Sequence, residues 1–412
     1  MGTIDLQREE LTEKEKRHIE ILEILRRRGP LSRPDIAKEM GINVVTISTY
    51  IDDFIKHNLV YEKELDISEG GRRPVLLDLN PQGGYIIGAG LNLMNMVGVL
   101  ADLKGNIVLK TQFDRPGASA REIVECLLGI IREIIRRSKD YTKDIRGIGV
   151  GIAGIIDKKN GSVRWPERIS YNYTNYVSVN LPLRELIEKE FGLPAIIEND
   201  ATAACFGEQW LQLELSLKNI IYMFSGVGSG IMINGEIYTG RCGCAGELSI
   251  YNYKQEEQFS CSLGNPCFLK RWDMDLGIME DVKSMLAKDN KLADKFFKLT
   301  SSNIDNVDLR SVFIANRAGD TIACSALDKA AVRLGIKIAY LVNLLNPEVV
   351  VIGGGLEEAG ERFLNKVSLT VKDWAFREAT EDLRIVYSQL RGNAVAIGAA
   401  SLVTQRVFAK LL

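Results

Sequence analysis

Apolar residues near the start of the chain recur with the spacing of short amphipathic helices. The first predicted helix ends at Gly29 and Pro30, and its apolar face carries Ile19, Leu22, Ile24 and Leu25. Ser32 is the predicted N-cap of a second helix, which ends in a turn at Gly41. A third helix follows, with apolar positions at Val44, Ile47, Ile51, Phe54 and Ile55. Two short helices joined by a tight glycine turn indicate a helix-turn-helix, in which the second helix reads DNA.

A predicted β-hairpin extends this unit. Its strands lie within residues 59–68 and 75–80, and Gly70 and Gly71 allow the turn between them. Arginines at the tip suit phosphates or a narrow minor groove. The pattern therefore predicts a winged helix-turn-helix domain at residues 1–81, with a small helical protein-interaction module as the alternative. The candidate DNA-binding residues are Ser32, Arg33, Asn43, Thr46, Ser48, Thr49, Arg72 and Arg73.

The charge of this unit limits how it can bind DNA. Residues 1–80 contain 13 Lys and Arg against 16 Asp and Glu, so the unit is net acidic. The predicted reading helix begins without an arginine that could bind a guanine. Small hydroxyl and methyl contacts are individually weak, so binding to double-stranded operator DNA should require two half-sites. We therefore expect a homodimer or a dimer of dimers.

From Gly83 onward, predicted strands alternate with helices, and several strands end in glycine-rich loops. This pattern predicts an α/β fold with two lobes, residues 82–200 and 201–412, the last helix returning to the first lobe. Loops at the strand ends would face a cleft between the lobes, where ligands bind.

Composition favours a soluble cytoplasmic protein. No apolar run has the length of a membrane span, and the polar start is unlike a signal peptide. Seven cysteines are an odd number in a chain of 412 residues without a secretory signal. That favours free or metal-bound thiols over a disulfide framework.

The order of motifs resembles the ROK family of repressors and sugar kinases. The segments "GGRRP", "GVGIAG", "ENDATAACFGE", "SGVGSGIMINGEIYTG", "AGE" and "LLNPEVVVIGGG" follow one another as in that family. The resemblance extends from about Leu11 to the C-terminus. It implies an actin-like, hexokinase-like fold of the RNase H type behind the DNA-binding unit.

The resemblance also identifies a departure from the kinases of the family. Their first strand carries an Asp followed by Gly-Gly-Thr, which holds ATP phosphates and Mg²⁺. The counterpart of the Asp is Gly90, and Asn92, Leu93 and Met94 replace Gly-Gly-Thr. Phosphoryl transfer depends on positioning and charge compensation, so we expect no kinase activity. A second glycine-rich segment persists at Gly226, Gly228 and Gly230, where a tight hairpin explains the glycines without a nucleotide.

Sugar-binding positions of the family are better preserved. The resemblance implies that Asp200 and Glu247 bind sugar hydroxyls and that Gly154 lets the sugar approach the backbone. Asn199 beside Asp200 suits vicinal hydroxyls, because an amide donates where a carboxylate accepts. Both residues also suit a helix N-cap.

A zinc site of the family is altered. One His and three Cys hold zinc in the family, and the Gly-His pair becomes Ser249–Ile250 here. The chain's two histidines, His18 and His57, both lie in the DNA-binding unit. Four thiolates could still bind one structural zinc; absence of metal and a reversible disulfide are the alternatives. The candidate ligands are Cys242, Cys244, Cys261 and Cys267.

Three functions follow from these observations. The first is a DNA-binding regulator, a repressor, whose kinase-like domain senses a sugar or sugar derivative and alters the placement of two reading helices. The second is an ATP-dependent sugar kinase with a fused DNA-binding domain. The third is a regulator whose second domain serves only for oligomerisation or protein contact.

Overall fold

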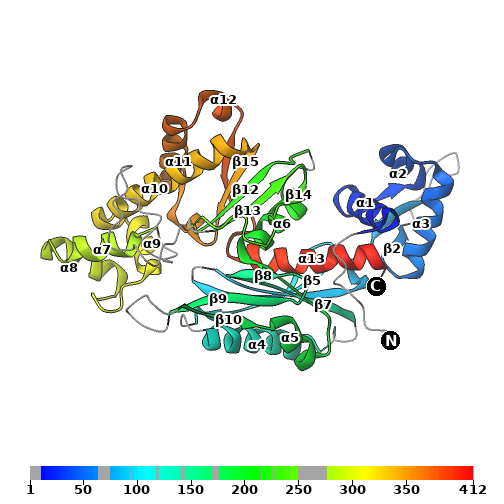
Figure 1. Cartoon of the computed structure of the whole chain (residues 1–412), viewed down its shortest axis with the longest axis horizontal. Helices are drawn as coiled ribbons and strands as arrows, with labels where there is room; N and C mark the ends of the chain where they lie inside the picture. Colours follow the sequence, from blue (N-terminus) through cyan, green and yellow to red (C-terminus); the bar gives the residue numbers. More distant parts are fainter. Residues whose placement is uncertain are drawn as a thin grey trace.

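A computed structural model describes residues 11–63, 75–92, 94–116, 120–139, 141, 144–168, 176–214, 216–225, 228–248 and 276–411. Figure 1 shows an N-terminal helical unit beside two larger α/β lobes. Among the described residues, no helix has both the length and the apolar character needed to span a membrane.

The N-terminal unit has the predicted order of elements. Its helices are α1 (Glu13–Arg28), α2 (Arg33–Met40) and α3 (Val44–Lys56), and its strands are β1 (Leu31–Ser32), β2 (Val60–Lys63) and β3 (Leu76–Leu79). The three strands form an antiparallel sheet in the order β1-β3-β2, in which β1 was not predicted. The tip between β2 and β3, with Gly70, Gly71, Arg72 and Arg73, lies outside the described residues.

The apolar face of α3 is narrower than the sequence pattern predicts. Ile47, Ile51 and Phe54 are fully buried, whereas Val44 and Ile55 are 42% and 36% exposed. Val44 lies in the first turn of α3 and Ile55 in the last, whereas the buried residues lie between them. The predicted helical spacing is confirmed, and two of the five apolar positions lie outside the core.

The first lobe contains a five-stranded sheet in the order β11-β7-β4-β5-β6, with the helices α4 and α5 (Figure 1). A three-stranded antiparallel sheet, β10-β9-β8, adjoins it. The elements of this lobe are β4 (Tyr85–Leu91), β5 (Asn95–Asp102), β6 (Ile107–Asp114), α4 (Ala120–Arg137), β7 (Ile145–Ile152), β8 (Ile155–Asp157), β9 (Ser162–Arg168), β10 (Tyr176–Leu181), α5 (Leu183–Phe191), β11 (Ala195–Asn199) and α6 (Asp200–Leu211).

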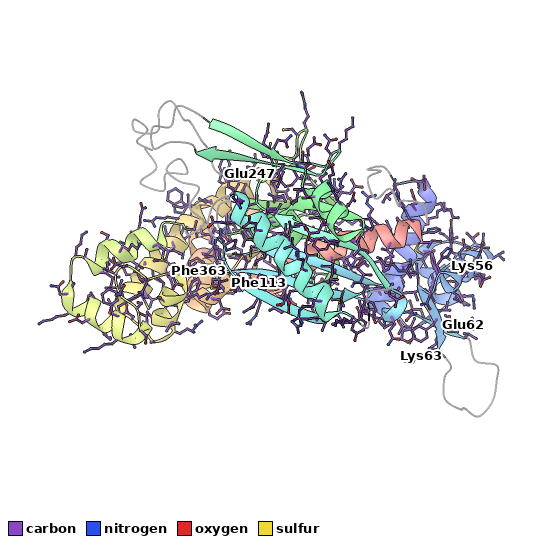
Figure 2. All side chains as sticks on the ribbon, turned by 90° about the horizontal axis from the view of Figure 1, so that it is seen from below. Lys56, Glu62, Lys63, Phe113, Glu247 and Phe363 are labelled. Atoms are coloured by element: carbon purple, nitrogen blue, oxygen red, sulfur yellow. The ribbon has the colours of Figure 1, made fainter. Side chains whose placement is uncertain are left out.

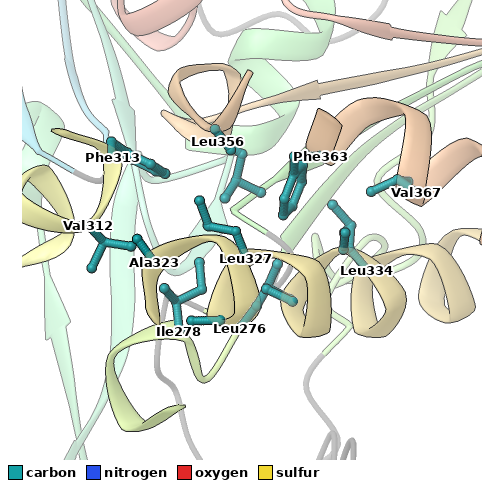
Figure 3. Packing of buried hydrophobic residues seen from close by; sticks show 14 of the residues in the cluster. Leu276, Ile278, Val312, Phe313, Ala323, Leu327, Leu334, Leu356, Phe363 and Val367 are labelled. Atoms are coloured by element: carbon teal, nitrogen blue, oxygen red, sulfur yellow. The ribbon is translucent and has the colours of Figure 1, made fainter. Parts of the chain in front are cut away.

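The second lobe contains another five-stranded sheet, in the order β14-β13-β12-β15-β16. Figure 3 shows how α11 and the turn before it pack on α10, with Phe363 and Val367 facing Leu327 and Leu334. The elements are β12 (Ile220–Phe224), β13 (Gly228–Ile233), β14 (Glu236–Ile237), α7 (Ile278–Leu286), α8 (Asn290–Thr300), α9 (Leu309–Arg317), α10 (Thr321–Leu345), β15 (Val349–Gly353), η3 (Leu356–Ala359), α11 (Glu361–Trp374), α12 (Arg377–Thr380) and β16 (Arg384–Tyr387).

The last helix, α13 (Ala394–Lys410), packs against β4, β7 and α6. Glycines permit this close approach, since a Cβ atom on Gly88 would lie 2.0 Å from the carbonyl oxygen of Ala396. A Cβ atom on Gly398 would likewise lie 1.8 Å from the carbonyl oxygen of Ala203 in α6. The C-terminal end of α13 lies against the N-terminal unit (Figure 1).

The N-terminal unit does not have an isolated core. Leu22 and Leu25 of α1 belong to one buried apolar cluster with Trp210 of α6 and with Val407 and Phe408 of α13. The unit therefore shares its hydrophobic core with the lobes that follow.

Candidate functional site

The first turn of α3 presents short side chains to solvent. Asn43 caps this helix, because its side-chain oxygen accepts a hydrogen bond from the Thr46 backbone N–H over 2.8 Å. The hydroxyls of Ser48 and Thr49 donate to the carbonyl oxygens one turn earlier and remain able to accept. Val45 is an apolar residue of this turn and is 77% exposed. It was not among the candidate residues.

Two expected DNA contacts are already used within the protein. Ser32 is only 3% exposed, and its hydroxyl donates to Asp35 over 2.5 Å in the capping box of α2. Arg33 forms ion pairs with Asp52 at 3.1 Å and Glu62 at 3.2 Å. The assignment of Ser32 to the DNA surface is corrected, because a buried cap cannot reach a phosphate without unfolding the start of α2.

The junction of β11 and α6 holds the first candidate ligand residues. The side-chain oxygen of Asn199 accepts hydrogen bonds from the N–H groups of Ala201 and Thr202, at 3.0 and 3.2 Å. Its amide nitrogen donates to the carbonyl oxygen of Gly154 over 3.2 Å. Asn199 thus acts as the N-cap of α6 and ties that helix to the loop after β7.

Asp200, the first residue of α6, is buried at 6% exposure. The pKa of this carboxyl is raised from 3.8 to about 7, first by burial and then by the negative charge of Glu247, against the hydrogen bond from the Ala201 N–H and the charge of Arg115. Arg115 was not predicted; it donates to the backbone oxygen of Asn92 over 2.6 Å. A carboxyl that titrates near neutral pH can accept or donate a hydrogen bond to a hydroxyl.

Glu247 reaches this region through a loop that docks on β13. The Ser229 N–H donates to the carbonyl oxygen of Gly246 over 2.8 Å, and Gly228 and Glu247 form an isolated antiparallel bridge. Figure 2 shows Glu247 near the middle of the molecule, far from Lys56 and Lys63 at the end of the N-terminal unit. The loop and α6 thereby bring the two candidate carboxylates, Asp200 and Glu247, within electrostatic reach of each other.

In the second glycine-rich segment, Gly230 has a packing role. A Cβ atom on Gly230 would lie 2.3 Å from the carbonyl oxygen of Ala201, so β13 can approach α6 only with glycine there. Gly228 has no such constraint, since its nearest contact would be 3.7 Å away. Gly226 lies outside the described residues.

The side chain of Asn92 occupies the turn after β4. The Asn92 oxygen accepts from the N–H groups of Met94 and Asn95, both at 2.8 Å, and its amide donates to the carbonyl of Gly392. A Cβ atom on Gly90 would lie 2.4 Å from Cγ1 of Val395. The backbone donors of this turn are therefore engaged, and Gly90 has no room for a side chain. Leu93 lies outside the described residues.

Two of the four candidate zinc ligands are described. The sulfur atoms of Cys242 and Cys244 lie 3.4 Å apart, and Cys261, Cys267 and Ile250 lie outside the described residues. In the part of the chain that the structure describes, no group of three or more His, Cys, Asp or Glu side chains could hold a metal ion. The family's histidine-containing zinc site does not fit this chain, because His18 and His57 both lie in the N-terminal unit.

The other end of α6 contacts the N-terminal unit. Arg27 of α1 donates to the carbonyl oxygens of Gln209 and Leu213, at 2.6 and 2.8 Å. Arg26 donates to the carbonyl oxygen of Trp210 and lies 4.9 Å from the centre of its ring. The two arginines thus bind carbonyl groups at the C-terminal end of the helix that begins at Asp200, a role that the sequence did not reveal.

Comparisons with known proteins agree with this architecture. The ROK family sequence model matches residues 89–406. A xylose repressor from Caldicellulosiruptor bescii is 29% identical over 376 residues, which span 90% of this chain and 91% of that protein. Because the first 80 residues are about a fifth of the chain, that match includes part of the N-terminal unit.

Two further relatives extend the comparison. A glucokinase from Halalkalibacterium halodurans is 33% identical over 273 residues, which span 64% of this chain and 77% of that enzyme. The crystal structure of a ROK family transcriptional regulator, a homologue of the Escherichia coli Mlc protein, has a TM-score of 0.70 at 22% identity and covers 97% of both chains. The predicted α/β fold is therefore confirmed.

Proposed function

Because the chain belongs to the ROK family, we propose that it is a sugar-responsive transcriptional repressor. Residues 11–80 bind double-stranded operator DNA, and Asp200 and Glu247 bind hydroxyl groups of a sugar or sugar derivative. Similarity to a xylose repressor across both parts of the chain supports this proposal.

The observation that best supports this proposal is the position of α6. This helix begins with Asp200 at the ligand site and ends with carbonyl groups that Arg26 and Arg27 of the N-terminal unit bind. A shift of α6 on ligand binding would move those carbonyl groups against α1. The ligand then changes DNA affinity because it favours one placement of the N-terminal unit over another.

On the DNA side, the exposed first turn of α3 suits apolar base contacts. Val44 and Val45 are exposed there and can contact thymine methyl groups, while the hydroxyls of Ser48 and Thr49 can accept hydrogen bonds. Arg72 and Arg73 at the hairpin tip would bind phosphates.

The kinase alternative is disfavoured by two contacts. The Asn92 side chain occupies the N–H groups of Met94 and Asn95, which phosphate oxygens would need. Val395 fills the space beside Gly90 that a metal-binding carboxylate would need. The chain is therefore proposed to lack ATP phosphotransfer, although a glucokinase is among its relatives.

An exposed apolar face on the second lobe is proposed to bind a second copy of the chain. Tyr340 and Leu344 are one turn apart on α10 and are 67% and 62% exposed. Phe376, 71% exposed, adjoins them because its N–H donates to Asn343 over 2.9 Å. A dimer through this face would supply the second reading helix that weak base contacts require.

Light scattering, which measures the mass of the particle in solution, tests this face. Tyr340→Asp should lower that mass towards the mass of one chain, whereas Ile304→Asp at an exposed position should not. An unchanged mass in Tyr340→Asp would exclude this face.

The proposal is tested with the purified full-length protein. Selection from random-sequence DNA should yield an inverted repeat, since the dimer places two reading helices on one site. Sugars and sugar derivatives that raise the melting temperature should then weaken binding to that DNA. DNA binding without sequence preference, or a bound sugar that leaves operator affinity unchanged, would overturn the proposal.

A further inference from the structure

A cavity of about 600 Å³ lies between the β8–β9–β10 sheet of the first lobe and the loop after β14 of the second. Its size is within the range of small-molecule sites. Neither Asp200 nor Glu247 lines it, so it is distinct from the two candidate sugar carboxylates. Among its described lining residues, the cationic side chains are Lys158, Lys159, Arg164 and Arg241, and Asp157 is the carboxylate.

Within the described residues, most of the positive charge of this cavity is not compensated by carboxylates. Among the described residues, Lys159, Arg164 and Arg241 have no carboxylate within ion-pair distance. The carboxylate of Asp157 accepts hydrogen bonds from the Lys159 N–H at 3.0 Å and the Asn160 amide at 2.9 Å, within its own turn. Cations gathered in a concave site raise the local concentration of anions.

Both walls of the cavity are held in place. Arg184 is 7% exposed and donates to the carbonyl oxygens of Lys158 and Lys159, at 2.7 and 3.2 Å. On the opposite wall, a Cβ atom on Gly243 would lie 2.8 Å from the carbonyl oxygen of Ile156. The loop after β14 therefore approaches β8 closely. The backbone that carries the cationic residues is held in place by these contacts.

One carboxylate connects the cavity with the candidate sugar site. Glu198 accepts from Lys158 at 2.9 Å through one oxygen and from the Asn199 N–H at 2.9 Å through the other. Asn199 in turn caps α6 and precedes Asp200. A ligand that extends from Asp200 towards Gly154 would therefore reach the cavity wall that begins at Ile155.

We infer that this cavity binds the acidic group of the effector, which is an anionic sugar derivative: a sugar phosphate or a sugar acid. This inference rests on the proposed function, because the bound anion is an effector only if it changes operator affinity. Guanidinium groups suit both anions, because two parallel N–H donors match two oxygens of a phosphate or a carboxylate. Lys159 and Arg164 lie in the first lobe, and Arg241 lies in the loop after β14 of the second lobe. An anion bound by all three would therefore bridge the two lobes.

Calorimetry on the full-length protein without DNA tests the inference. The probes are glucose, glucose 6-phosphate, glucuronate, N-acetylglucosamine, N-acetylglucosamine 6-phosphate and inorganic phosphate. At least one phosphorylated or acidic member should bind about tenfold more tightly than its neutral counterpart, and salt should weaken it. Comparison of glucose 6-phosphate with glucuronate distinguishes the two acidic groups. Equal affinity for neutral and anionic members, or no binding of any anion, would overturn the inference.

Variants locate the site. Arg164→Ala and Arg241→Ala should each weaken anion binding by about tenfold, because each removes a charge-assisted contact. Arg241→Lys keeps the charge but loses the two parallel N–H donors, so its affinity should lie between those of Arg241→Ala and the wild type. Arg377→Ala, at an exposed arginine of the second lobe, is the matched control and should bind as the wild type does. Wild-type affinity in both cavity variants would exclude this cavity, and unchanged melting temperatures would show that folding is intact.

Failure of the two ideas can be told apart. If the anion binds in the cavity but operator affinity does not change, the proposed sensor function fails and the cavity assignment stands. If a neutral sugar releases the operator and Arg241→Ala has no effect, the sensor function stands and the cavity assignment fails.

Discussion

Arg27 donates a hydrogen bond to the carbonyl oxygen of Gln209 over 2.6 Å, so α1 of the N-terminal unit is bound to the end of α6. Carbonyl groups in the last turn of a helix lack partners within that helix and carry the negative end of its dipole. A guanidinium group is therefore well suited to this position. Since α6 begins at Asp200, a single helix spans the distance between the candidate ligand site and the N-terminal unit.

Replacing Arg27 by Met should uncouple the two sites. The apolar stem persists while both hydrogen bonds to α6 are lost. We expect the ratio of operator affinities without and with ligand, typically about 5 to 150 in coupled systems, to fall towards one. Ligand affinity itself should change little, and fluorescence anisotropy with labelled operator would measure the ratio.

The matched control for this variant is Arg136→Met on α4, where the arginine pairs with Glu133 on the surface. It should retain the wild-type ratio. Coupling that persists at full strength in Arg27→Met would show that the Arg27 hydrogen bonds to α6 do not carry the signal.

Asp200 should make stability fall as pH rises. Its folded-state pKa is about 7 against 3.8 when unfolded, so between these values the folded state holds a proton that the unfolded state has lost. Stability is then lost progressively as pH rises through this window, by up to about 4 kcal/mol. Asp200→Asn removes this contribution and keeps an oxygen for the Ala201 N–H.

Urea unfolding at pH 5 and pH 8 measures the effect. The stability of Asp200→Asn relative to wild type should increase from pH 5 to pH 8, whereas Asp305→Asn at an exposed site should show no such trend. The same stability difference at both pH values would mean that Asp200 ionises normally.

Val45→Ala should weaken specific operator binding by about 1 to 3 kcal/mol if this methyl-bearing side chain contacts a base. Binding to random DNA should be unaffected, because apolar contacts carry no salt-dependent term. Ile304→Ala, which is exposed in the second lobe, is the control. Equal losses for operator and random DNA would place Val45 away from the bases.

Adding a side chain at Gly90 should damage the fold without creating a kinase. Gly90→Ala would bring a Cβ atom to 2.4 Å from Val395 and should cost about 1 to 3 kcal/mol of stability. Gly228→Ala, with its nearest contact at 3.7 Å, should be tolerated. Neither the wild type nor Gly90→Asp should consume ATP with any aldose; turnover by the wild type would restore the kinase alternative.

We expect the purified protein to contain far less than one zinc ion per chain. The histidine of the family's site is replaced by Ile250, and His18 is engaged with the carbonyl oxygen of Ala409 at 3.1 Å. Atomic emission measures the metal content. One zinc per chain, lost in Cys242→Ser and in Cys261→Ser, would instead indicate a site of four thiolates.

Local patterns were sufficient for most elements. Helical spacing identified α1, α2 and α3, and the predicted N-cap of α2, Ser32, accepts a hydrogen bond from the turn that follows. The N-caps Thr12 and Asn43 were not predicted. The same capping rule indicated an N-cap at Asn199–Asp200, whereas the ligand role of Asp200 came from the resemblance to the family. Periodicity placed Val44 and Ile55 on the apolar side of α3 but could not show that both are exposed.

Contacts between distant segments left no such signature. Arg26 and Arg27 in the last turn of α1 are what the helix dipole alone would favour, so nothing in the local sequence indicated a role on α6. The same holds for Arg115, whose approach to Asp200 depends on the pairing of β5 with β6. Lys158 and Arg241 are brought to one cavity only when the two lobes meet.

The shared core of α1, α6 and α13 has a consequence for protein engineering. Leu22 and Leu25 are buried against Trp210 and Phe408, so residues 11–80 are not a freely exchangeable module. A chimera that grafts this unit onto another sensor would expose these side chains unless the recipient supplied matching ends of both helices. Swapping operator specificity should therefore succeed when the graft is confined to the surface of α3 and fail when its boundary is drawn at residue 81.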